Sequence, residues 1–149
     1  MRILIRRFTT AAVLASTSFA TIAAEPKLAF EPFLDCAGAH VYHRYLAEAA
    51  DRPDDDALQA LDKQILFYLQ IAESLSQRSL RKEFVDASAS EAQRAQKVMK
   101  AGGSDAYLTY YTDRKNECGR LVKEHQSEIM DAVNAVYESQ EQRSSEQRR

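Results

Sequence analysis

The sequence predicts an all-α protein: a four-helix bundle with up-down-up-down connections that follows a cleaved signal peptide. Apolar residues recur at the three- and four-residue spacing of an amphipathic helix in four consecutive stretches. The connections between these stretches are short, which favours antiparallel neighbours. The only two cysteines, Cys36 and Cys118, fall on the first and the last stretch. The pattern therefore also predicts that one disulfide links helices one and four.

Residues 1–24 are typical of a secretory signal peptide. Three arginines lie within the first seven residues, a short run of apolar and small residues follows, and small residues at 21–24 suit cleavage after Ala23 or Ala24. The apolar run is shorter than the about 20 residues that span a bilayer. Removing this segment takes away three arginines and no acidic residue, so the formal net charge changes from −2 to −5.

Charge and cysteine content narrow the class of protein. A mildly acidic mature domain lacks the concentrated basic face that nucleic-acid binding needs, so no nucleic-acid partner is expected. A cysteine pair in an exported chain indicates an oxidising compartment, and we expect a periplasmic or secreted protein without a membrane span in its mature form. The expected partner is another protein of the envelope, and a homo-oligomer stays open.

The first helix is expected over residues 33–50. Pro32 suits its first turn, where a missing N–H is tolerated, and Pro53 follows its end. Its apolar residues are spread around the helix, with only Asp35, Arg44 and Glu48 as charged breaks. Such a helix is expected to be covered by neighbours on more than one side.

The second helix is expected from residue 57 to the high seventies, and the aspartates at 54–56 favour its start by capping. Calcium binding by these aspartates is the weaker interpretation, because the ligand pattern of a dedicated loop is absent. The junction at 74–79 contains no Gly or Pro, so one bent helix and two separate helices are both open.

The third helix is expected over residues 80–101 and the fourth over residues 104–138. Gly102 and Gly103 supply the left-handed residue of a helix end, and Ser104 can cap the next helix. The small residues at 87–90 are expected to let the third helix approach the bulky segment 65–71 of the second. Residues 139–149 contain no apolar residue, so the bundle domain is expected to span 25–138, with a disordered tail after it.

The two cysteines lie on helices that are adjacent and antiparallel in such a bundle. A Cys36–Cys118 bridge closes a loop of about 82 residues, for which the chain-entropy relation gives at most about 4–5 kcal/mol of stabilisation. Two free thiols are the alternative, but their spacing does not resemble a Cys-x-x-Cys redox pair.

A metal site is the alternative function. Cys36, His40 and His43 share one helical face, and a thiolate with two imidazoles suits zinc or copper. A disulfide at Cys36 would remove that thiolate, and His125 cannot replace it, because the imidazoles of His43 and His125 would then lie about 20 Å apart. In the simpler interpretation, His40 and His43 are partly buried and hydrogen-bond to nearby tyrosines. No cofactor is expected otherwise.

Seven tyrosines and no tryptophan are the clearest compositional bias. Tyrosine suits interfaces because it joins an apolar ring to a polar tip. Tyr42, Tyr107 and Tyr110 are candidate partner-binding residues, and Tyr110 lies off the apolar stripe; the alternative is that these rings belong to the core. Six basic residues are expected to form a solvated side that could dock an acidic partner: Arg78, Arg81, Lys82, Arg94, Lys97 and Lys100.

No catalytic signature is present in the sequence, which has neither a His-Glu-x-x-His nor a Gly-x-Ser-x-Gly motif and only four glycines in all. The favoured function is therefore a small exported protein that is not an enzyme and acts by binding another protein, in an accessory, inhibitor or immunity-like role.

Overall fold

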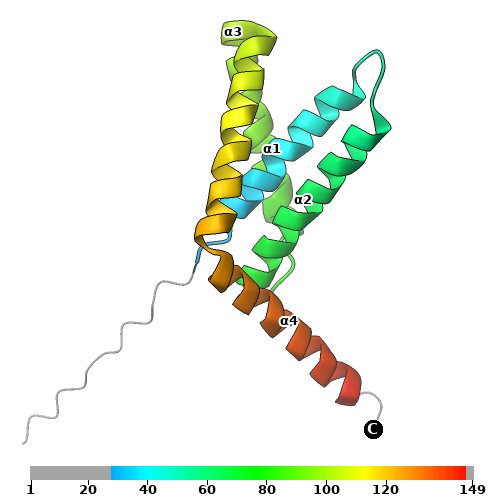
Figure 1. Ribbon diagram of the computed structural model, residues 1–149, viewed down its shortest axis with the longest axis vertical. Helices are drawn as coiled ribbons and strands as arrows, with labels where there is room; N and C mark the ends of the chain where they lie inside the picture. The colour runs from blue at the N-terminus through cyan, green and yellow to red at the C-terminus, as the bar shows by residue number, and fades with distance from the viewer. Residues whose placement is uncertain (1–27, 147–149) are drawn as a thin grey trace, which may run out of the picture.

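The computed structural model describes residues 28–146, and every regular element in this part of the chain is helical (Figure 1). The elements are α1 (Glu31–Glu48), α2 (Asp55–Ser76), α3 (Arg81–Glu124) and α4 (Gln126–Glu146). Helix α3 folds back on itself at Gly103, so α1, α2 and the two halves of α3 form the up-down-up-down arrangement. The all-α bundle is confirmed, whereas the expected signal peptide lies outside the described residues.

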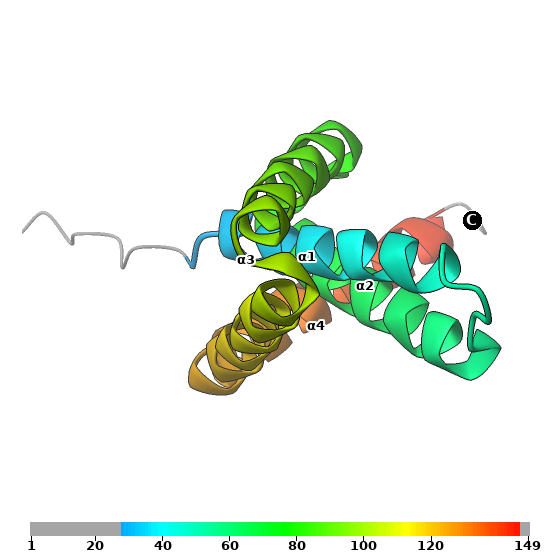
Figure 2. The same ribbon diagram turned by 90° about the horizontal axis from the view of Figure 1, so that it is seen from above.

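Helix α1 lies at the centre of the molecule, with α2 and both halves of α3 around it (Figure 2). Helices α2 and α3 make almost no close backbone contact with each other, so α1 holds the bundle together. Its buried residues point in all directions: Phe33, Leu34, Cys36, Ala37, Gly38, Ala39, His40 and Tyr42. The prediction that this helix is covered on more than one side is confirmed.

Helices α2 and α3 are separate. The side chain of Asp54 caps α2, because its Oδ1 accepts hydrogen bonds from the N–H groups of Asp56 and Ala57 at 3.0 and 3.2 Å. At the other end, Gln77 adopts the left-handed conformation, with φ of 58°, and ends the helix. The carboxylate of Glu73 then accepts the Leu80 N–H at 3.0 Å, which orients the chain as it enters α3.

The small residues of α3 meet α1 rather than α2. An ideal Cβ on Gly38 would lie 3.0 Å from the Cα of Ser88 and 3.1 Å from the carbonyl oxygen of Ala87. Glycine at position 38 therefore lets the backbones of α1 and the first half of α3 pack in close contact. The expectation that residues 87–90 approach segment 65–71 was wrong, because α1, not α2, occupies the space beside them.

Two breaks shape the second half of the chain. Gly103, with φ of 74° and ψ of −165°, turns α3 through a tight hairpin at the predicted position. The second break, at His125, interrupts the single helix expected over 104–138. After it, α4 turns against the end of α2, and this turn brings Ile129 into the core. The helix continues to Glu146 instead of ending at Glu138, so most of the segment expected to be disordered is helical.

Buried side chains form two clusters. The main core surrounds the disulfide and lies where α2, α3 and α4 meet the first half of α1: it contains Phe33, Leu34, Cys36, Ala37, Tyr68, Ile71, Ala72, Leu75, Leu80, Cys118 and Ile129. A smaller group, here called the tyrosine cluster, joins α1 to the hairpin of α3 further along: it contains Tyr42, Ala95 and Tyr107. No helix between residues 28 and 146 is long and apolar enough to cross a membrane.

Candidate functional site

The predicted disulfide is present. Cys36 of α1 and Cys118 of the second half of α3 are bonded, with their Cα atoms 5.8 Å apart, and both side chains are buried. The bond joins α1 to the second half of α3, which is the first part of the stretch that the sequence predicts as the fourth helix. It also corrects the metal hypothesis, because a bonded Cys36 has no thiolate to offer as a ligand.

His40 lies two turns below the end of α1 and is only 1% exposed. Its ring stacks on Tyr68 of α2, with centroids 5.5 Å apart, and its Nδ1 lies 2.7 Å from the Tyr111 hydroxyl of α3. Burial, aided by the positive charges of His43 and Lys115, lowers its pKa from 6.5 to about 4. His40 is therefore a neutral, hydrogen-bonded part of the interior near pH 7.

His43 lies one turn further along the same face of α1. Its Nδ1 is 3.0 Å from the hydroxyl of Tyr107, and its ring stacks on Tyr111 with centroids 3.7 Å apart. Burial and the nearby Lys115 lower its pKa as well. We call His40, His43, Tyr107 and Tyr111 the histidine–tyrosine seam. The interpretation of both histidines as partners of the tyrosine-rich end is confirmed.

The structure offers no third ligand for a metal ion beside His40 and His43 in the described part of the chain. No three His, Cys, Asp or Glu side chains between residues 28 and 146 are grouped so that they could hold an ion. The Nδ1 atoms of His40 and His43 are already paired with tyrosine hydroxyls. His125 lies at the break between α3 and α4, where its neighbour is Glu128 at 3.5 Å.

The three tyrosines expected to bind a partner make internal contacts. Tyr42 and Tyr107 are buried, with their rings edge-to-face at 5.8 Å. Tyr110 is half-buried, and its hydroxyl donates a hydrogen bond to Glu91 at 2.6 Å. The contacts of Tyr110 fit the alternative interpretation, in which its ring belongs to the edge of the core, better than a role as a free surface anchor.

Glu91 is the buried residue that sequence reasoning missed. It is 1% exposed, and its carboxylate accepts hydrogen bonds from Arg94 at 2.6 Å, from Tyr110 at 2.6 Å and from Arg114 at 3.0 Å. These bonds tie the two halves of α3 together. The signal was available, because Glu91 falls at helical spacing between Ala87 and Ala95 on the inner stripe of its helix.

The expected basic side is partly neutralised by its own neighbours. Arg78 pairs with Glu83 at 2.7 Å, and Lys82 pairs with Asp86 at 3.2 Å. Arg94 donates to the buried Glu91. These contacts favour the interpretation of the basic residues as a solvated, ion-paired surface.

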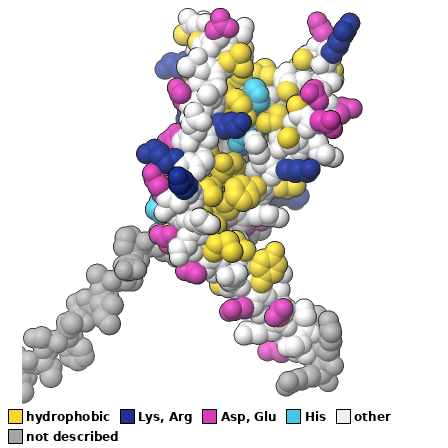
Figure 3. Space-filling model, in the orientation of Figure 1, with side chains coloured by type: hydrophobic (Ala, Val, Ile, Leu, Met, Phe, Trp, Pro, Cys, Tyr) yellow, Lys and Arg dark blue, Asp and Glu magenta, His cyan; other side chains and the backbone are white. Residues whose placement is uncertain are grey.

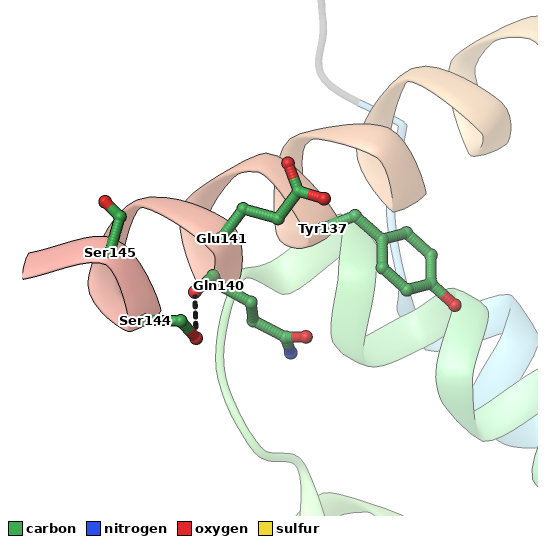
Figure 4. A pocket seen from close by; sticks show the side chains of 5 residues that line it. All are labelled: Tyr137, Gln140, Glu141, Ser144 and Ser145. Carbon is green, nitrogen blue, oxygen red and sulfur yellow. Dashed lines mark hydrogen bonds between the residues drawn. The ribbon is translucent and has the colours of Figure 1, made fainter. Parts of the chain in front are cut away.

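A groove lies between the C-terminal part of α2 and α4 and encloses about 570 Å³. Val133, Val136 and Tyr137 supply its apolar lining. The rest of the lining carries amide, hydroxyl and charged groups: Gln70, Glu73, Ser74, Gln77, Arg78, Ser79, Ser139, Gln140 and Arg143. Figure 4 shows Tyr137 and Gln140 on α4 together with Glu141, Ser144 and Ser145, which line an adjoining hollow. We call the groove between α2 and α4 the α2–α4 groove.

Tyr137 is the most exposed large apolar side chain of the described chain, at 64%. Met130 precedes it by seven residues on the same helix face and is also exposed. Hydrophobic side chains are also visible along the middle of the bundle in Figure 3, with histidine side chains among them. The accessible tyrosine on the groove is thus Tyr137, which the sequence pattern did not single out.

Comparison with known proteins gives no match for this chain among protein-family models, curated proteins or solved structures.

Proposed function

We propose that this chain is an exported, non-enzymatic protein that binds another protein through the α2–α4 groove. The single observation that carries the proposal is the exposed ring of Tyr137 in a groove that is also lined by Val133 and Val136. Protein–protein interfaces typically combine aromatic and apolar side chains with surrounding polar groups. Exposed tyrosines are favoured anchors because a rigid ring supplies contact area and its hydroxyl supplies a hydrogen bond.

The chemistry of the polar lining points to a peptide segment as the occupant. Glutamine and serine side chains can hydrogen-bond to the backbone of an extended or helical segment. Arg143 adds a cation at one end, which favours an acidic side chain on the partner. We therefore expect a segment that places an apolar side chain against Val133 and Val136 and a carboxylate near Arg143.

Two further features support this role and its compartment. The disulfide is compatible with an oxidising compartment such as the periplasm or the extracellular space. His40 and His43 are paired with tyrosine hydroxyls, and the burial of His40 shields it from any substrate. The interior therefore favours a structural use of its titratable groups over a catalytic one.

Site-specific photo-crosslinking tests this proposal. A photo-reactive amino acid at position 137 should give a discrete crosslinked product in the producing cell, whereas one at position 45 should not. Tyr45 is the matched control, because it is equally exposed, at 63%, but lies on α1 away from the groove.

The crosslinked protein is then identified, purified and tested for binding. Tyr137→Ala should weaken its affinity at least tenfold, and Tyr45→Ala should leave the affinity unchanged. Equal crosslinking from both positions, or equal loss of affinity in both variants, would rule out the groove as the site. A product with a second copy of this chain would identify the partner as the protein itself.

A further inference from the structure

The contacts between α1 and the hairpin of α3 change in character along α1. Near its start, the disulfide Cys36–Cys118 fixes the second half of α3 to α1, and Gly38 touches the backbone of the first half. One turn later, the contacts pass to the histidine–tyrosine seam and the tyrosine cluster. The α3 hairpin is thus bonded covalently to α1 near Cys36, whereas closer to its tip only polar and aromatic contacts hold it to α1.

We infer that the histidine–tyrosine seam is an acid-sensitive latch, which releases the tip of the α3 hairpin from α1 while the disulfide end stays closed. This inference concerns the end of the bundle away from the α2–α4 groove and does not depend on the proposed function. The pivot is the level of Cys36 and Gly38, where α1 meets both halves of α3. The moving part is the hairpin around Gly103.

The surroundings of the two imidazoles explain why acid opens the latch. Towards α3, the two imidazoles meet the hydroxyls of Tyr107 and Tyr111, and the positive charge of the exposed Lys115 acts on both of them. Towards α2, His40 faces the ring of Tyr68. Neither imidazole forms a hydrogen bond or an ion pair with a carboxylate in the part of the chain that the structure describes. A second proton on His40 would therefore create a buried cation without an acidic partner.

Neighbouring charges on the other sides are already paired. Arg44, the next residue of α1, donates to Glu48 at 2.7 Å and also bonds Asp62 of α2. Arg114 and Tyr110 of α3 are bonded to Glu91. These groups keep their partners when the imidazoles are protonated. Attraction of an imidazolium to the face of Tyr68 offsets only a small part of the cost of removing the cation from water.

Protonated His40 and His43 would also repel each other, and the exposed Lys115 of α3 acts on both imidazoles in the same direction. The charge is relieved when the hairpin tip moves away and water reaches the imidazoles. Because the Glu91 network joins the two halves of α3, the hairpin moves as one body. The main core and the disulfide do not contain the two histidines and stay in place.

Tyrosine near-ultraviolet circular dichroism tests the latch directly, because the chain has seven tyrosines and no tryptophan. In the oxidised full chain, the tyrosine signal should fall by about half between pH 7 and pH 4.5, while the far-ultraviolet helix signal changes by less than a tenth. An unchanged tyrosine signal would refute the latch. A simultaneous loss of both signals would refute it too, because it would indicate global unfolding.

Two sets of variants assign the transition to the seam. His43→Gln and His40→Gln should each reduce the acid-induced change, whereas His125→Gln, at the α3–α4 break, should keep it. Lys115→Gln is an exposed change that removes the repelling charge, and it should move the transition to lower pH by about half a unit. Lys123→Gln, on the same half of α3, is its control. If Lys115→Gln and Lys123→Gln titrate like the unaltered chain, the latch is not controlled by this seam.

Discussion

The carboxylate of Glu91 and the guanidinium of Arg114 lie 3.0 Å apart between the two halves of α3, with Glu91 only 1% exposed. This pair, completed by Arg94 and Tyr110, is the most deeply buried ionic contact in the described chain. A buried ion pair adds little net stability relative to an apolar pair, but removing one partner leaves an uncompensated charge. The hairpin of α3 therefore depends on both partners.

Glu91→Gln should lower the free energy of unfolding by about 3 kcal/mol, because Arg114 loses its buried counter-charge. Urea unfolding followed by far-ultraviolet circular dichroism measures the effect. Glu83→Gln is the matched control, since its pair with Arg78 is exposed to solvent and its loss should leave the urea midpoint nearly unchanged. Equal destabilisation by the two changes would contradict the importance of the buried network.

Cys118→Ser should lower the free energy of unfolding by up to about 4 kcal/mol, because an 82-residue loop is no longer closed in the unfolded chain. Thermal unfolding without reductant should show a clear drop in Tm. Adding reductant to the unaltered protein should reproduce this drop, whereas the variant should not respond to it. A variant that melts together with the oxidised unaltered protein would show that the bond does not stabilise the fold.

Gly38→Ala should destabilise the protein by about 1–3 kcal/mol. The new methyl group would lie 3.0 Å from the Cα of Ser88, so backbone rather than a flexible side chain would have to move.

Gly119→Ala provides the opposite result at a second helical glycine. Apart from its chain neighbours and the backbone of its own helix, no atom lies within 4 Å of an ideal Cβ there. Alanine is the better helix former, so the variant should gain about 0.5–1 kcal/mol. Urea midpoints for the two variants measure both effects. A shift of both in the same direction would contradict the close contact at Gly38.

The stability of the bundle should fall as the pH drops below 6.5. Burial lowers the pKa of His40 from 6.5 to about 4, so the unfolded chain binds more protons than the folded chain within this range. The stabilisation that depends on neutral His40 is fully present above pH 6.5, and about 2 kcal/mol of it should be lost by pH 5. His43 acts in the same direction, because burial lowers its pKa too.

Urea unfolding at pH 7.5 and pH 5 measures this loss. Between these two pH values, the free energy of unfolding of His40→Gln should fall by about 2 kcal/mol less than that of the unaltered protein. His125→Gln is the control and should show the same pH dependence as the unaltered protein. A His40→Gln variant with the full pH dependence would show that another group is responsible.

The sequence by itself determined the helices and the covalent link. Helical periodicity located α1, α2 and the two halves of α3, and Gly103 marked the hairpin between them. The pairing of Cys36 with Cys118 followed from their positions on the first helix and on the stretch predicted as the fourth, which are antiparallel neighbours in an up-down bundle. Helical periodicity and the conformational freedom of glycine act within a few residues of the chain, so the sequence shows them directly. Short connections then determine which helices are antiparallel neighbours.

Only the tertiary structure decided which surfaces meet. The chain carries no helix breaker at His125, yet α4 turns there because Ile129 gains burial against the main core. Tyr110 lies off the apolar stripe but is used internally, since the buried Glu91 needs a donor at that point. Tyr137 is left outside. Burial and hydrogen-bond pairing depend on the side chains of other helices, and no periodicity within one helix contains that information.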